Sequence, residues 1–358
     1  MTTTHPFPVT EPDAAGGARA GFFLLEETGL RDRRFRFALP LPEGWARRGE
    51  AGRAPSTESP HEILACFAPP GEPEAEMVVT GRLLAREVAP ADLLLSEVER
   101  SGEERLRHRE VDSEDGRTID VLTRRRTENG VLVLRRSVMK RGRRMLVLTA
   151  AAKEERWARW AAPLAASAAG LRFLEPGSFR CAEPLGTLSR KEPDDFLLFH
   201  PASWALGEPA AARPGVVSAR LVNGAGGQAV GRLDLAVVAR AVRPGPRELV
   251  DEYVAKLAAG GLEAPPVPLR PATAPAAFRR AWEGVVEATS GEARLELRFA
   301  IGERPAAWYC FALTGPARAA APEAWAVNRR ALEVAFGLVA TPDVPMRGWI
   351  AEEIGKGR

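Results

Sequence analysis

Apolar and polar residues alternate along several stretches of this chain, the pattern of β-strands with one buried and one solvated face. The runs at 33–41 and 294–301 show it most clearly. Further strands are predicted at 21–26, 63–67, 77–87, 118–126, 130–140, 143–150, 216–222, 232–240 and 308–314. An Asn-Gly link, an Arg-Gly link and a glycine-rich run at 223–227 predict tight hairpin turns between neighbouring strands.

Four other stretches repeat their apolar residues every three or four positions, which predicts helices. Two of these helices begin at Pro90 and Pro246, a position where the missing proline N–H costs little. The other two carry tryptophan near their start, one over 157–171 and one containing Trp325. The helices separate the strands into groups of two and three.

The order of these elements occurs twice. Trp45 and Trp204 each follow a proline by three positions and a phenylalanine by eight. After each tryptophan come a hairpin, a proline-initiated helix, a meander and a closing helix. We therefore predict an α+β fold of two tandem domains, each an antiparallel β-sheet covered by helices. The predicted parts are a disordered lead-in (1–20), a first domain (21–175), a linker (176–191), a second domain (192–341) and a C-terminal tail (342–358).

Composition narrows the class of protein. Of the 358 residues, 45% are hydrophobic and 27% are charged, which is ordinary for a globular protein. The N-terminus lacks the basic and apolar regions of a secretory signal, and no apolar run approaches the ~20 residues that span a bilayer. These features predict a cytoplasmic protein without membrane insertion. The sequence does not indicate an oligomeric state.

Candidate chemistry is sparse. The cysteines Cys66, Cys181 and Cys310 are far apart, and the four histidines are scattered, so no disulfide, metal site or cofactor is predicted. The run Gly224–Ala229 is similar to a dinucleotide-binding loop, but a strand follows it where that loop needs a helix N-terminus. No cysteine has the context of a catalytic nucleophile. We expect no catalytic residues and no enzyme; a site assembled from loops remains a third alternative.

The strongest charge signal lies at residues 117–145, where ten basic residues stand against two acidic ones. A basic sheet face of this kind would attract an anionic partner. Nucleic acid is disfavoured, because interleaved aromatic residues are missing from the strip. The alternative interpretation is a solvated outer face balanced by acidic neighbours, in keeping with a net charge of only +3. The candidate partner-binding residues are Arg124, Arg126, Arg135 and Arg136.

The opening of the first repeat carries a family resemblance. The run Leu41-Pro42-Glu43-Gly44-Trp45 follows a phenylalanine-containing strand, and with the element order it resembles the PsbP-like fold family, which includes the DcrB-like proteins. The chain looks most like the Eag-type chaperones of type VI secretion effectors, which open similarly. Such chaperones are typically dimers of a single domain that shield apolar N-terminal helices of an effector. The second repeat departs from the motif, reading Ala202-Ser203-Trp204.

The resemblance implies a non-catalytic, intracellular protein-binding module. We expect a chaperone or adaptor for an effector of a type VI secretion or contractile-injection apparatus. It would bury an apolar helix or strand of its client against a sheet face or between the two copies. The alternative function is a scaffold that binds an anionic partner through the basic sheet face, with affinity that falls steeply with salt.

Overall fold

The computed structural model describes most of the chain and divides it into two compact units. One unit is Met1–Ala85 with Ala89–Ala182, and the other is Arg86–Val88 with Glu183–Arg358. The structure describes residues 5–8, 20–30, 32–49, 60–71, 75–113, 116–175, 180–207, 214–225, 228–242 and 245–355.

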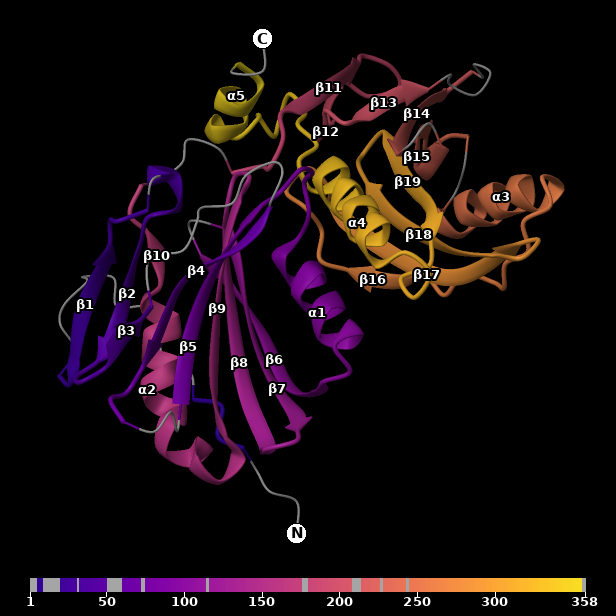
Figure 1. The fold of residues 1–358 in the computed structure, drawn as a ribbon. Helices are drawn as coiled ribbons and strands as arrows, with labels where there is room; N and C mark the ends of the chain where they lie inside the picture. The colour runs from indigo at the N-terminus through magenta and orange to yellow at the C-terminus, as the bar shows by residue number, and fades with distance from the viewer. Residues whose placement is uncertain are drawn as a thin grey trace. The chain divides into compact units, whose positions relative to one another are not determined.

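The first unit is built on a seven-stranded antiparallel sheet in the order β3-β4-β5-β9-β8-β7-β6. Helices α1 (Pro90–Arg100) and α2 (Trp157–Gly170) lie on opposite faces of this sheet (Figure 1). A small sheet in the order β1-β2-β10 packs on the α2 side. The strands are β1 (Phe22–Glu27), β2 (Phe37–Pro42), β3 (Ala46–Arg48), β4 (His61–Ala68), β5 (Ala75–Leu83), β6 (Glu104–Ser113), β7 (Gly116–Thr127), β8 (Gly130–Arg141), β9 (Arg144–Lys153) and β10 (Arg172–Phe173).

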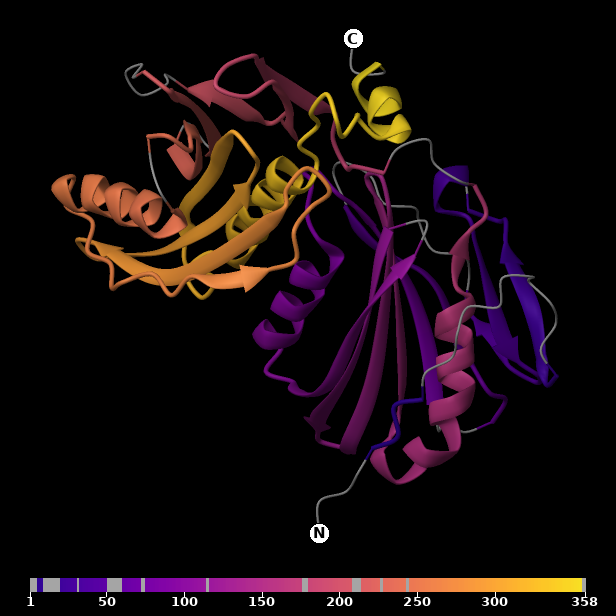
Figure 2. The same ribbon diagram turned by 180° about the vertical axis from the view of Figure 1, so that it is seen from behind.

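The second unit repeats this plan, with sheet order β13-β14-β15-β19-β18-β17-β16. Its helices α3 (Pro246–Ala259) and α4 (Pro322–Gly337) again lie on opposite faces (Figure 2). The chain ends in a short helix, α5 (Gly348–Gly355). The strands are β11 (Leu185–Arg190), β12 (Phe196–Pro201), β13 (Trp204–Gly207), β14 (Val216–Ala225), β15 (Gln228–Ala239), β16 (Arg270–Ala272), β17 (Arg280–Ser290), β18 (Ala293–Glu303) and β19 (Ala307–Pro316).

The matching strand orders confirm the predicted α+β class and its repetition. Strand register aligns the two copies residue by residue. Leu148 pairs with Val79 in the first sheet, and Leu313 pairs with Leu233 in the second. The glycine-rich run is a hairpin, as predicted, because Ala225 pairs with Gln228 across it in an antiparallel ladder.

The structure adds elements that the sequence pattern did not predict. Strand β6 has charged residues at both alternating sets of positions, which suits a sheet edge but hides the period of two. In strand β17, Gly284 interrupts the sequence pattern of side chains, and a Cβ at this position would lie 2.6 Å from Val267 Cγ1. Each meander therefore has four strands rather than three. Strand β11 lies within the range predicted as a linker, and α5 lies within the predicted tail.

Large apolar side chains fill the space between sheet and helices in both units. Trp45 and Trp160 meet edge to face in the first core, with ring centroids 5.4 Å apart, and Trp204 is buried in the second. This placement agrees with the interpretation of the tryptophans as core anchors. Within the described ranges, no helix has the length and apolar character needed to span a bilayer.

Candidate functional site

A hollow of about 760 Å³ lies in the second unit between α3 and the floor formed by β14, β15 and β19. The apolar side chains of α3 pack in one buried cluster with residues of β15, β17, β18 and β19. Beside this cluster, Val216, Ser218 and Ala236 of β14 and β15 are only half-buried. We call this hollow the α3 groove.

Most of the α3 groove is apolar. Its size falls in the range of roughly 300–1,000 Å³ that is usual for ligand pockets, which are also largely apolar. Val242, at the rim, is 39% exposed. The apolar lining consists of Pro214, Val216, Ala219, Leu235, Ala236, Val238, Val242, Leu249, Leu257, Leu262, Cys310 and Ala312.

One end of the groove is polar and is organised around Asp234. Its carboxylate accepts hydrogen bonds from Arg220 Nε at 2.8 Å, Arg232 Nε at 2.5 Å and the Tyr253 hydroxyl at 2.7 Å. Burial, together with the neighbouring carboxylate, raises the pKa of Tyr253 well above its usual value, so this hydroxyl stays a donor. One carboxylate faces two guanidinium groups, and the cluster carries a net charge of +1.

The remaining ionisable groups of the groove are either paired with an opposite charge or held in their neutral form. Lys256 Nζ lies 2.8 Å from Glu252 Oε1 one turn earlier on α3. Burial, and secondarily the charge of Asp234, raises the pKa of the Cys310 thiol to about 12. A thiol with this pKa is protonated at neutral pH and is a poor nucleophile. In the part of the chain that the structure describes, no cluster of His, Cys, Asp or Glu could hold a metal ion.

The groove cluster is particular to the second copy. Strand register and helix starts place Ile63, Thr80 and Glu97 of the first unit where the second has Arg220, Asp234 and Tyr253. The same sheet and helix therefore form without the cluster. None of these residues was predicted from the sequence as part of a functional site. The available signal was a charged residue, Asp234, between apolar neighbours in strand β15.

The four arginines selected from the sequence do not form one surface. Arg135 and Arg136 are consecutive in β8 and point to opposite faces of the sheet. Arg135 is 1% exposed and is held by Asp120, whereas Arg136 forms a two-pronged pair with Glu103 at 2.5 and 2.7 Å.

The other two members of the set lie on strand β7. Arg124 Nε is 3.2 Å from Glu154 Oε1, and Arg126 is exposed. Acidic partners that lie elsewhere in the sequence thus neutralise much of the basic strip. These four arginines therefore do not provide one surface to which an anionic partner could bind.

Comparison with known proteins gives similarity of fold only. No protein-family model and no curated protein sequence matches the chain. Among solved structures, cyanobacterial PsbP (CyanoP) from Synechocystis sp. PCC 6803 is 13% identical, with a TM-score of 0.33, and the match covers 43% of this chain and 94% of that one.

Two further solved structures match over most of the chain. The type VI secretion system immunity protein TplEi from Pseudomonas aeruginosa is 13% identical with a TM-score of 0.25, covering 85% of this chain and 98% of that one. A chain of the Tle4-Tli4 complex is 12% identical with a TM-score of 0.22, covering 80% and 96%. Similarities of this size identify neither a family nor a function.

Proposed function

We propose that this chain is a non-catalytic, intracellular protein-binding module, a chaperone or adaptor, and that the α3 groove holds an apolar segment of its client. The observation that carries the proposal is the groove itself: about 760 Å³ of mostly apolar space beside a polar cluster whose members are already paired. A client in the type VI secretion or contractile-injection class follows from the family resemblance of the sequence and stays a prediction.

The state of the ionisable groups favours binding over catalysis. A catalytic nucleophile or general base needs a pKa near the working pH. Cys310 has the opposite shift, since burial keeps its thiol protonated, and Tyr253 is likewise held in its neutral form. Asp234 is committed to three donors. An apolar ligand entering the groove would displace water from Val216, Ala236 and Val238, at roughly 25 cal/mol per Å² of apolar surface.

The chemistry of the groove defines the segment that fits. Its apolar side chains would lie along the floor and against Leu249 and Leu257 of α3. The polar end carries a net positive charge, so an acidic residue at one end of the segment would be favoured beside Arg220. Arg220 is about one-third exposed, which leaves room for a second carboxylate.

Site-specific photocrosslinking tests the proposal. A benzoylphenylalanine placed at Ala236, on the groove floor, should capture a polypeptide when the protein is expressed in its own host. The same label at Leu206, which is 54% exposed and outside the groove, is the matched control. The captured polypeptide is then purified and its binding to unlabelled protein is measured.

Binding of the purified polypeptide to variants of the protein tests whether the α3 groove is its site. Ala236→Trp fills the groove and should weaken binding by more than about tenfold, whereas Leu206→Trp should leave it unchanged. Apolar capture should depend little on salt, and Arg220→Glu should weaken it only a fewfold. Equal crosslinking at both positions, equal affinity of both tryptophan variants, or recovery of a small metabolite in place of a polypeptide would each contradict the proposal.

A further inference from the structure

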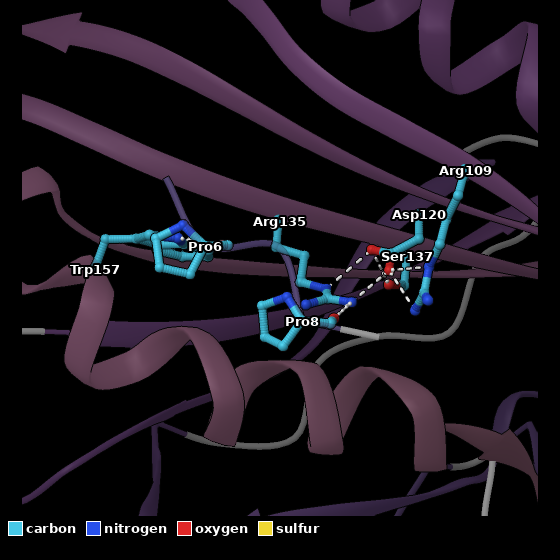
Figure 3. A network of polar contacts seen from close by, with 7 residues as sticks. All are labelled: Pro6, Pro8, Arg109, Asp120, Arg135, Ser137 and Trp157. Atoms are coloured by element: carbon cyan, nitrogen blue, oxygen red, sulfur yellow. Dashed lines mark hydrogen bonds and ion pairs between the residues drawn. The ribbon is translucent and has the colours of Figure 1, made fainter. Parts of the chain in front are cut away.

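The N-terminal residues His5, Pro6, Phe7 and Pro8 contact polar and aromatic side chains of the first unit; Figure 3 shows Pro6 and Pro8 among them. The Trp157 indole N–H donates to the Pro6 carbonyl at 2.8 Å, and Arg135 Nη2 donates to the Pro8 carbonyl at 3.0 Å. We define the peptide slot as Arg109, Asp120, Arg135, Glu154 and Trp157.

Side chains add to these backbone contacts. The Phe7 ring lies under two guanidinium groups, with its centroid 4.8 Å from Cζ of Arg135 and 5.7 Å from Cζ of Arg109. His5 Nε2 is 2.8 Å from Glu154 Oε1. An aromatic ring that faces two cations gains cation–π attraction from each, strongest where water is excluded.

The sequence of the segment prepares it for this slot. Pro6 and Pro8 have fixed φ angles, and each disfavours the helical region for the residue before it. The segment is therefore biased towards an extended, polyproline-like shape before it binds. Little conformational entropy is lost on binding, as in other cases of proline-rich peptide recognition.

The slot residues are also held to one another by hydrogen bonds within the first unit. Asp120 accepts from Arg135 Nε at 3.0 Å, Arg109 Nε at 3.1 Å and the Ser137 hydroxyl at 3.0 Å (Figure 3). Arg135 is nevertheless left with spare capacity, because its buried Nη1 has no hydrogen-bond partner among the described residues. The segment thus leaves one donor of the slot unused, which a ligand with a further acceptor would satisfy.

The second copy shows that the fold does not need the slot. The register places Glu296 where the first copy has Arg135, and Val285 where it has Asp120. Helix α4 starts with Pro322 at the position of Trp157, so no indole donor is present there. Three slot residues are thus absent from a copy with the same sheet and helices.

We propose that the peptide slot is a recognition site for extended Pro–aromatic–Pro segments, and that residues 5–8 of this chain are its ligand in cis. The two carbonyl acceptors, the ring that faces two guanidinium groups and the unused donor are features of a peptide-binding site. The segment occupies the slot and blocks it; a partner segment of the same chemistry binds in trans when residues 5–8 leave. This site is separate from the α3 groove and does not depend on the function proposed for it.

A truncated chain that lacks residues 1–8 provides the test. The probe is a fluorescent peptide with the sequence of residues 4–9, Thr-His-Pro-Phe-Pro-Val, and binding is followed by fluorescence polarisation. The truncated protein should bind the peptide saturably, and at least about tenfold more tightly than the full chain, in which the slot is occupied. A peptide with Phe7→Ala should bind about tenfold more weakly. Trp157→Phe, which removes the N–H donor together with part of the buried ring, should weaken binding at least about fivefold.

Two outcomes overturn the proposal: a folded truncated protein that does not bind the peptide, and equal binding by the truncated and full chains. If truncation prevents folding, the full chain with Phe7→Ala replaces it. That variant keeps both carbonyls but loosens the segment, and it should bind the peptide more tightly than the unaltered chain. Equal affinity of these two full-length proteins refutes the proposal in that case.

Discussion

Replacing Asp120 with alanine removes the carboxylate that holds the two arginines of the peptide slot in place. Asp120 and Arg135 are only 3% and 1% exposed. The carboxylate accepts four hydrogen bonds: two from Arg135 at 3.0 and 2.5 Å, one from Arg109 at 3.1 Å and one from Ser137 at 3.0 Å. The substitution leaves the Arg135 guanidinium buried without its counter-ion.

The cost follows from this burial. Breaking a buried ion pair by removing one partner typically costs about 3–5 kcal/mol, because the other charge is left uncompensated. Arg109 is about one-fifth exposed and can turn to water, so its loss adds little. We expect Asp120→Ala to lower the free energy of unfolding of the first unit by about 3–5 kcal/mol, or about two to three and a half orders of magnitude in the opening equilibrium.

Native-state hydrogen exchange measures this effect in one unit at a time. A global unfolding curve would mix the transitions of both units, whereas the amides of β7 and β8 report on the first unit alone. In Asp120→Ala, the protection factors of these amides should fall by about two to three and a half orders of magnitude. Glu104→Ala in the same unit is the matched control: its side chain is 63% exposed and 3.6 Å from Arg124, so the change should stay within about 0.5 kcal/mol.

A double variant separates the buried charge from general damage. Asp120→Leu combined with Arg135→Met replaces the ion pair with apolar groups of similar volume and should recover most of the lost protection. If Asp120→Ala reduces protection less than tenfold, or if the double variant is as unstable as the single one, the buried pair does not act as described.

Three further predictions concern the second unit. Gly231→Ala should destabilise it by about 1–3 kcal/mol, because the new Cβ would lie 2.3 Å from Oδ1 of the buried Asn328. Gly337→Ala on α4 meets nothing within 4 Å and should stabilise it by up to about 1 kcal/mol; native-state hydrogen exchange of the β15 amides compares the two variants. Burial lowers the pKa of His200 below its ordinary 6.5, so the unfolded chain takes up a proton first as the pH falls. The stability of the second unit should be full above about pH 7 and decline below about 6.5, and His200→Gln should flatten that decline in the protection factors of its amides measured across this range. The Cys310 thiol, with its pKa raised to about 12, should resist iodoacetamide at pH 8 in the folded protein and react when the protein is unfolded in urea. Because Cys66 is partly exposed, the label is located by peptide mass mapping, and rapid alkylation of Cys310 itself in the folded protein would contradict its buried position.

The two copies share a fold but differ in the polar groups placed on it. The first has the Asp120 network and the peptide slot, and the second has the Asp234 cluster and the α3 groove. Each set is replaced by unrelated residues in the other copy, although strand order and helix positions are the same. Polar residues that the shared fold does not require are the natural places to look for what each copy binds.

Local patterns in the sequence predicted most of the element types and the repeat. Alternation over 294–301 predicted β18, the Asn-Gly link predicted the β7–β8 turn, and Pro90 and Pro246 predicted the starts of α1 and α3. These features depend on residues close together in the chain, where side-chain period and backbone restriction act directly. Alternation failed at β6, where charged residues occupy both sets of positions.

Only the tertiary structure decided which of these residues act together. Arg135 and Arg136 are adjacent in sequence, but the strand sends them to opposite faces, to Asp120 and to Glu103. The α3 groove depends on where a helix lies across a sheet, and the peptide slot depends on contacts between residues about 130–150 positions apart. Such contacts follow from packing the whole unit, because the periodicity of one segment carries no information about which distant segment it will meet.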